Sequence, residues 1–451
     1  MKAFILATLV SAVLVQAGPV PPEVQAAVEK RQALGYLTTL LGKGGKVADP
    51  PGAAPKKQVM KSDSVLPNVK RVKMRYGPYS VPNMNKTGLT GEAGALWNYP
   101  DTGIPKPCTE CTIVSQQAGL EYPNGDNANI DTGMWLHHMV HFTIGPGRSD
   151  PTCFGRSSLP HVDVGTSPSN GERYFSSGNE RTRIMIDKRG AATDFGYHLR
   201  TNDKFAFIVD LMNMNMEDKT VYLTMTYDII EGPLPPNWRE LKTVWFDANQ
   251  CGTSEVAAVK QTGSYTITAR PWKANFEGEI IGVGGHLHDG GVDLQILSGE
   301  QQQCNSVAQY GERPEYLFRG KMGAMANYAD KHISSMSACY NEALTVRQLV
   351  PGQVWTIKAR YDYDKFPGNR DHAGKQESVM AIALMYVAVK PGSVQLGGAS
   401  SAPAAPGAPA APAAPGAPGA AGPPMPRPKG VKGLPKQPRV TPGSAPPEGG
   451  A

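Results

Sequence analysis

The sequence contains FAFIVDLMNM at residues 205–214 and TVYLTMTYDII at residues 220–230, two apolar runs of strand length. Similar runs follow, separated by Gly, Pro, Asn and Asp: SYTITARPW (264–272), VDLQIL (292–297), VWTIKARYDY (354–363) and SVMAIALMYVAV (378–389). Runs rich in β-branched and aromatic residues between turn formers are typical of antiparallel β-sandwiches and jelly rolls. No segment shows the apolar spacing of a long amphipathic helix. We therefore predict an all-β protein.

The segment EGPLPPNW, residues 231–238, divides this apolar region into two halves of ordinary domain size. We expect two tandem antiparallel β-sandwich (jelly-roll) domains, residues 72–232 and residues 233–395.

The two ends of the chain differ from its middle in composition. Residues 1–17 have a lysine, an apolar stretch and a small-residue ending, as in a secretory signal peptide. Residues 18–71 are interpreted as a propeptide or loose leader, with processing sites at Lys30-Arg31 and Lys70-Arg71. Residues 396–451 form a Pro/Ala/Gly-rich tail that we expect to be disordered. We predict a secreted protein, extracellular or associated with the cell wall. The tail is a solvated spacer or, through its basic end, a contact to an acidic wall polymer.

The formal net charge of +6 comes from these ends, and residues 72–400 are slightly acidic. A nucleic-acid-binding protein would carry its positive charge on a folded face, so we expect no nucleic-acid partner. No run of 18 apolar residues follows the N-terminus, which argues against a membrane span. Motifs of serine hydrolases, zinc peptidases and nucleotide-binding folds are absent from the sequence.

An exported chain meets an oxidising compartment, where an even number of cysteines indicates disulfides. The six cysteines therefore predict three disulfides, whose pairing the sequence leaves open: Cys108, Cys111, Cys153, Cys251, Cys304 and Cys339. The spacing of Cys108 and Cys111 also suits a redox or zinc site, but no second pair completes four zinc ligands. Asn85 begins an N-glycosylation sequon.

Two clusters of histidines are the strongest chemical signal. In GVGGHLHDGG (282–291), His286 and His288 would project from the same face of a strand, as two ligands of one ion must. Asp289 could orient one of the imidazoles. In MWLHHMVHF (134–142), His137 and His138 can reach one ion only if the strand is bulged or ends there. The alternative for both clusters is ordinary polar or core histidines.

The chain has 17 methionines, several of them near these clusters. Most would fill the core, but thioether beside imidazole is the donor mixture that suits copper, Cu(I) above all. We therefore predict copper as the cofactor, one ion per chain, with two as the alternative.

With these residues in hand, the middle of the chain resembles the stress up-regulated Nod family of secreted proteins in its fungal form. The resemblance rests on WNYPDTGIPKPCTECTI (97–113), GLEYPNGDNANIDTGMWLHHMVHF (119–142) and GGHLHDGGVDLQIL (284–297). Through LHHM and HLH the chain also resembles the copper monooxygenases typified by peptidylglycine α-hydroxylating monooxygenase and dopamine β-monooxygenase.

This second resemblance implies one copper site in each domain. The main site would consist of His286, His288 and Met380, because HAGKQESVMAIALMY (372–386) is similar to the segment around the methionine ligand of that family. The other site would begin with the adjacent pair His137 and His138. Its third ligand would be Met212, allowing an offset of one or two residues, with His198 and His141 as alternatives.

The substrate side departs from that family. The positions matching its carboxylate clamp are Gly284, Ile382 and Leu384, which cannot bind an anion, so peptide amidation is not expected. Our leading hypothesis is a secreted copper monooxygenase-like oxidoreductase that acts, with an external reductant, on an unidentified extracellular substrate. The alternative is a non-catalytic copper-binding or copper-buffering stress protein of the cell surface. A structural wall protein with ordinary histidines is the third hypothesis.

Overall fold

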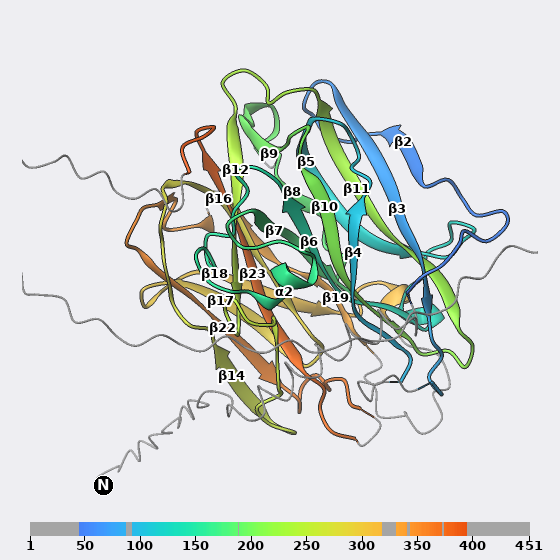
Figure 1. The fold of residues 1–451 in the computed structure, drawn as a ribbon. Coiled ribbons are helices and arrows are strands. Elements are labelled where there is room, and N and C mark those ends of the chain that lie inside the picture. Colours follow the sequence, from blue (N-terminus) through green and yellow to red (C-terminus); the bar gives the residue numbers. More distant parts are fainter. Residues whose placement is uncertain are drawn as a thin grey trace, which may run out of the picture. The chain divides into compact units, whose positions relative to one another are not determined.

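The computed structural model describes residues 45–86, 93–187, 189–317, 331–340, 343–371 and 374–394, all within one compact unit (Figure 1). The expected signal peptide, residues 18–44 of the expected leader and the Pro/Ala/Gly-rich tail lie outside these residues. Strands dominate the described part, which confirms the prediction of an all-β fold of sandwich type. Within it we find no helix with the length and apolar character of a membrane-spanning segment.

Three sheets build this unit, and the largest runs through both halves of the chain. Its main path is β1 (Gly45–Lys46), β3 (Val69–Val81), β11 (Lys219–Glu231), β5 (Cys111–Glu121), β9 (Phe195–Leu199), β12 (Arg239–Asp247), β23 (Val379–Val389), β16 (Gly278–Leu287) and β20 (Ala338–Tyr340). Four short strands pair beside this path: β2 (Lys57–Lys61) with β3, β8 (Ile184–Met185) with β5, β13 (Glu255–Val256) with β23 and β21 (Gln348–Leu349) with β16.

The other two sheets complete the sandwiches. A sheet from the first half has the order β4 (Ala95–Ile104), β10 (Lys204–Asn213), β6 (Met134–Ile144) and β7 (Gly171–Gly178). A sheet from the second half has the order β14 (Ser264–Thr268), β22 (Val354–Asp362), β17 (Gly291–Ser298), β18 (Gln301–Tyr310) and β19 (Ile333–Met336), with β15 (Trp272–Lys273) beside β22. The described helices are single turns or little more: η1 (Ile130–Thr132), α2 (Leu159–Asp163), η2 (Gly190–Ala192) and η3 (Pro314–Tyr316).

The first sheet begins earlier in the chain than residue 72. β2 pairs with β3 from Lys57 opposite Met74 to Lys61 opposite Lys70, inside the stretch expected to be a leader. Arg71 also forms ion pairs with Asp63 and Asp228. The suggested processing site at Lys70-Arg71 therefore lies within a paired strand.

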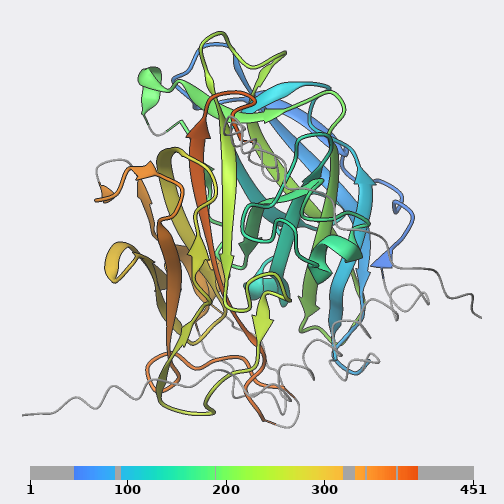
Figure 2. The ribbon, with the colours of Figure 1, turned by 60° about the vertical axis from the view of Figure 1, so that its left-hand side comes forward.

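The two halves are held together by the strands β12, β23 and β16, here called the inner strands (Figure 2). The even-numbered residues of β23 from Met380 to Ala388 pack into the apolar core of the first half. Its odd-numbered residues from Val379 to Val389 pack into the core of the second half. A strand buried on both faces must be apolar at every position, which explains the unbroken run VMAIALMYVAV.

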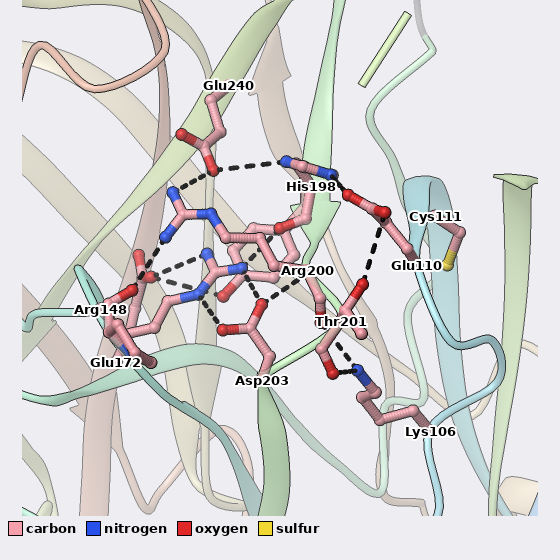
Figure 3. A network of polar contacts seen from close by, with 12 residues as sticks. Lys106, Glu110, Cys111, Arg148, Glu172, His198, Arg200, Thr201, Asp203 and Glu240 are labelled. Carbon is pink, nitrogen blue, oxygen red and sulfur yellow. Dashed lines mark hydrogen bonds and ion pairs between the residues drawn. The ribbon is translucent and has the colours of Figure 1, made fainter. Parts of the chain in front are cut away.

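β9 and β12 join the two parts of the large sheet through a short parallel pairing, Phe195 with Arg239 and Gly196 with Glu240. Figure 3 shows the buried polar network beside this seam, in which the Arg148 guanidinium faces the Asp203 and Glu172 carboxylates. Arg200 donates to Glu240 at 2.6 Å in the same network. Buried charges stay stable only with partners, so the network fixes the relative placement of these strands.

The cysteines form three disulfides, as predicted: Cys108–Cys111, Cys153–Cys251 and Cys304–Cys339. Only the second of them connects the two halves, and its cysteines are 98 residues apart in sequence. Asn85 is exposed, as its sequon requires, and its glycosylation stays a prediction.

Replacing Cys153 and Cys251 together by alanine should lower the free energy of unfolding by about 2–5 kcal/mol, because a crosslink across a long loop restricts the unfolded chain most. Urea unfolding followed by tryptophan fluorescence would measure this change. The matched control is the double alanine variant of Cys108 and Cys111, which are three residues apart. It should cost much less, and equal losses would contradict this account.

Arg148→Met should destabilise the fold by about 3–5 kcal/mol, because it leaves the buried Asp203 carboxylate without its cation. Arg200→Met is the control, since the Arg200 side chain is 34% exposed and its ion pair with Glu240 should be worth about 1 kcal/mol or less. Thermal unfolding of both variants gives the comparison. A loss for Arg148→Met no larger than for Arg200→Met would show that the buried network contributes little.

Candidate metal centre

A bulge in β6 turns two adjacent histidines toward one place. His138 pairs with Asp210 of β10, and Leu136 pairs with Leu211, so His137 has no residue opposite it. Such an extra residue bends the strand and changes the direction of its side chains. The ring centroids of His137 and His138 lie 5.2 Å apart. The sequence required a bulge if both imidazoles were to serve one ion, and the structure has it.

The second half supplies a third imidazole. β16 ends at Leu287, and His288 follows directly, with its Nδ1 donating to the Ser378 carbonyl at 2.9 Å. The His288 ring centroid lies 4.3 Å from that of His137 and 5.8 Å from that of His138. One nitrogen from each ring lies within 4.8 Å of the others. We call His137, His138 and His288 the histidine cluster.

Several nitrogens of this cluster are buried without a hydrogen-bond partner, as expected for ligands of a metal ion. Both nitrogens of His137, Nδ1 of His138 and Nε2 of His288 are buried without a hydrogen-bond partner. Buried polar atoms normally have partners, so several orphaned nitrogens that converge need an explanation. Neutral imidazole is a good ligand for copper, and a ligand ring usually donates its other N–H to an oxygen, as His288 does.

Two buried carboxylates accompany the cluster. Asp210 lies 3.5 Å from His137 and 3.5 Å from His138, and both of its oxygens lack a hydrogen bond. Glu255 accepts from Nε2 of His138 at 2.9 Å, which leaves Nδ1 of that ring free. Together, His138, Asp210 and Glu255 form a second group that could hold an ion. The negative charges of the Asp210 and Glu255 carboxylates would offset the charge of a buried cation.

Burial and these charges set the protonation of the rings. Burial lowers the pKa of His137, but the Asp210 carboxylate outweighs it and raises the pKa to about 9. Burial, followed by the neighbouring imidazoles, holds the pKa of His288 well below its usual value. His288 is therefore neutral and has a lone pair to offer, whereas the metal-free His137 is protonated near neutral pH and would release a proton on binding a metal ion.

His286 lies at the edge of the cluster. As predicted for residues two apart on a strand, it projects beside His288, and their ring centroids are 5.5 Å apart. Its Nδ1 donates to Glu180 at 3.0 Å, and its Nε2 is buried without a partner. Glu180 also accepts the Gly178 N–H, which places the end of β7 against His286.

Met380, the predicted third ligand of the main site, is buried on the adjacent strand. His286 pairs with Ile382, and Leu287 pairs with Ala381. Met380 comes directly before Ala381 in β23 and projects from the same face of the sheet as Ile382. In β13, Glu255 pairs directly with Met380. The strand register thus places Met380 next to a residue that contacts the histidine cluster, and its role as a ligand stays a prediction.

The other predicted ligands lie elsewhere. Met212 pairs with Trp135 and packs into a separate apolar cluster, whereas Asp210, two residues earlier in β10, pairs with His138. His141 is surrounded by aromatic rings. His198 contacts Glu110 in the network of Figure 3.

Asp289 was expected to orient a ligand imidazole, but its carboxylate contacts His332 and accepts the Ile333 N–H. His332 lies outside the two histidine clusters of the sequence.

The sequence patterns did not identify three carboxylates of this region: Asp210, Glu180 and Glu255. A single acidic residue forms no recognisable motif. The one signal for Asp210 was that the third ligand, predicted at Met212, could lie one or two residues away. The structure also brings His288 from one predicted copper site together with His137 and His138 from the other.

Known proteins resemble this chain in sequence, although no family model matches it. Probable copper-dependent oxygenase M1 of Phoma sp. is 29% identical over 316 residues, which are 70% of this chain and 72% of the relative. Probable copper-dependent oxygenase clz3 of Cochliobolus lunatus is 30% identical over 271 residues, which are 60% of this chain and 77% of the relative.

Among solved structures, PNGase F, a glycosylasparaginase from Flavobacterium meningosepticum, aligns with 71% of this chain and 96% of its own. The TM-score of 0.31 and the identity of 10% are too low to indicate a shared fold.

Gly178→Ala should disturb the centre, because its Cβ would lie 2.5 Å from Cε1 of His286 and 2.7 Å from the His137 carbonyl oxygen. Overpacking of this kind costs about 1–3 kcal/mol. Thermal unfolding of the metal-free protein and NMR of its imidazole nitrogens would show the loss and the displaced rings. Ser177→Ala, at the neighbouring buried position, is the control and should leave both unchanged. Unshifted imidazole resonances in Gly178→Ala would contradict the close packing of β7 on His286.

Proposed function

This chain belongs to the family of the probable copper-dependent oxygenases, and from that premise we propose that it is a copper-dependent, monooxygenase-like oxidoreductase. The observation that carries the proposal is the histidine cluster, in which unpartnered imidazole nitrogens from both halves converge in a buried place. In this proposal His137, His138 and His288 hold one copper ion per chain.

The donor set fits copper in both of its common oxidation states. Imidazole with carboxylate nearby suits Cu(II), and a thioether suits Cu(I). Met380, if it reaches the ion, would add the soft donor. Bound copper would supply the one-electron chemistry by which oxygen is activated.

The protein residues around the ion have separate tasks. Asp210 and Glu255 balance charge and orient the rings of His137 and His138. The Ser378 carbonyl fixes the His288 tautomer, so that Nε2 faces the cluster. The buried surroundings keep water away, which strengthens every electrostatic interaction at the site. His286, whose Nδ1 donates to Glu180, is a further candidate ligand.

The reaction would need an external reductant and an extracellular substrate. The positions Gly284, Ile382 and Leu384 offer no group for a peptide carboxylate, so we propose an activity other than peptide amidation. Three disulfides are in keeping with export. Secretion, contact with the cell wall and membership of the stress up-regulated Nod family stay predictions.

One observation favours a second function, copper binding without catalysis. Each residue of the histidine cluster is at most 6% exposed, as expected for an ion that is stored rather than used. Oxygen consumption separates the two functions, because a buffering protein with bound copper would consume no oxygen above the background of free copper when a reductant is added.

Elemental analysis of the copper-loaded, desalted protein tests the proposal. We expect one copper per chain, and at least tenfold weaker binding in His137→Ala and in His288→Ala, because each removes a ligand and leaves buried partners unsatisfied. Met380→Leu should weaken Cu(I) binding more than Cu(II) binding if its thioether is a ligand.

His198→Ala is the matched control, since His198 lies in the polar network beside the seam, and it should retain the copper. Copper retained by His288→Ala, or none above background in the wild type, would overturn the proposal. Two tightly held coppers would replace the single centre by two separate sites.

A further inference from the structure

A pocket outside the candidate metal centre lies between the two halves of the protein. Its first wall is formed by residues between Pro151 and Arg156, and its second wall includes Gln250 and residues 270–273. The pocket has a volume of about 200 Å³ and shares no lining residue with the cavity at the histidine cluster. We call it the Arg270 pocket.

Contacts at the Pro151 carbonyl hold the two walls together. This oxygen accepts a hydrogen bond from Nε1 of Trp272 at 3.3 Å and another from Nδ2 of Asn275 at 2.9 Å. The Cys153–Cys251 disulfide links the first wall to the residue that follows Gln250. The pocket is therefore formed before a ligand arrives, so binding would cost little ordering entropy.

Three cationic side chains line the pocket: Arg156, Arg270 and Lys273. Each of these residues is exposed, and no ion pair joins its side chain to a residue that the structure describes. Among the described residues, no aspartate or glutamate contributes to the lining. The pocket thus presents positive charge from both halves of the protein, although residues 72–400 as a whole are slightly acidic.

The acidic residues that are close to the walls in sequence are not part of the lining. Asp150 and Asp247 both form ion pairs with the buried Arg173 guanidinium. Glu277, two residues after Asn275, is exposed and also lies outside the lining. An anion in the pocket would therefore meet three cations and no carboxylate.

Gln250 adds a hydrogen-bond acceptor to the lining. The residue is 6% exposed, and its Oε1 is buried without a hydrogen-bond partner. Its Nε2 makes a long contact of 3.4 Å to the Trp245 carbonyl oxygen. Because buried oxygens normally accept a hydrogen bond, a hydroxyl group of a ligand would supply the missing donor.

The size and charge of the pocket indicate the class of ligand. Its volume is many times that needed for one water molecule, so an anion with an attached polar group would fit. Arginine binds the oxygens of phosphate and carboxylate groups in pairs, and lysine binds them as a point charge. A carboxylate offers one charge and two oxygens. A phosphate monoester carries about 1.5–2 negative charges at neutral pH and has three terminal oxygens, one for each cation.

We propose that the Arg270 pocket binds the phosphate monoester of a small hydroxylated molecule, such as a sugar phosphate. Arg156, Arg270 and Lys273 hold the phosphate group, and Gln250 accepts a hydrogen bond from a hydroxyl of the attached group. The pocket is separate from the histidine cluster, so the proposal does not depend on copper.

Isothermal titration calorimetry on the full-length protein at low salt tests the ligand class with four probes: glucose-6-phosphate, glucuronate, glucose and inorganic phosphate. Glucose-6-phosphate should bind at least tenfold more tightly than glucuronate, which has a single charge, and than inorganic phosphate, which has no attached sugar. Glucose should show no measurable binding, because it lacks the anion.

Arg270→Gln and Lys273→Gln test the site. Each removes one cation at an exposed position and should weaken the binding of glucose-6-phosphate at least tenfold, because a charge-assisted hydrogen bond is lost. Lys61→Gln is the matched control, since Lys61 is exposed on β2 outside the lining, and it should bind as the wild type does. Gln250→Met should reduce the preference for glucose-6-phosphate over inorganic phosphate, because the acceptor for the hydroxyl is removed.

Several results would contradict the proposal. Equal affinity for glucuronate and glucose-6-phosphate, or no binding of either, would overturn the phosphate monoester as the ligand class. Equal affinity for inorganic phosphate would show that the ligand is the free ion and would overturn the attached group. Unchanged binding in both Arg270→Gln and Lys273→Gln would overturn the Arg270 pocket as the site.

Discussion

The burial of both faces of the inner strands is the constraint on which the rest of the structure depends. β23 has an apolar core on each side, and its even-numbered and odd-numbered residues divide between them. The first half therefore packs directly against one face of the inner strands, and the second half packs against the other. This packing brings the end of β16 to the bulge of β6, so the candidate centre is a product of the contact between the halves.

Polar groups at that contact are tolerated because they have partners or would gain one. Arg173 is fully buried and pairs with Asp150 from its own half and with Asp247 from the other. The imidazoles of the histidine cluster lack such partners for several nitrogens, although they are just as deeply buried. The difference between a satisfied ion-pair network and an unsatisfied imidazole cluster is the physical reason to expect an ion at one and not at the other.

Local sequence patterns were sufficient to predict the fold class. They could not predict which residues far apart in the sequence come into contact. Strand-forming runs such as 220–230 and 378–389 predicted a β-sandwich protein, because strands and turns can be recognised from the amino-acid composition of short segments. The pair His286 and His288 was found by its spacing, and the need for a bulge at His137 followed from strand geometry. By contrast, Asp210 is a single carboxylate in an apolar strand, and no local pattern distinguishes it from a solvated acid.

The prediction of one copper site in each domain followed from the resemblance to the copper monooxygenases, and the grouping of His288 with His137 and His138 was not part of it. Only the packing of the halves shows that His288 faces His137, and packing is not encoded in any short segment. The β9–β12 seam and the Cys153–Cys251 disulfide are similar cases, because each joins residues whose proximity depends on the whole fold.

The anchoring of His288 has a consequence for the order in which the protein matures. Its ring is held by the carbonyl of Ser378, directly before the last strand of the described fold, while two of its companions belong to β6. During synthesis the cluster can be completed only after nearly the entire described chain has emerged and β23 has been inserted between the two cores. Only a completely folded molecule would then bind the ion, and incomplete or misfolded chains would lack it.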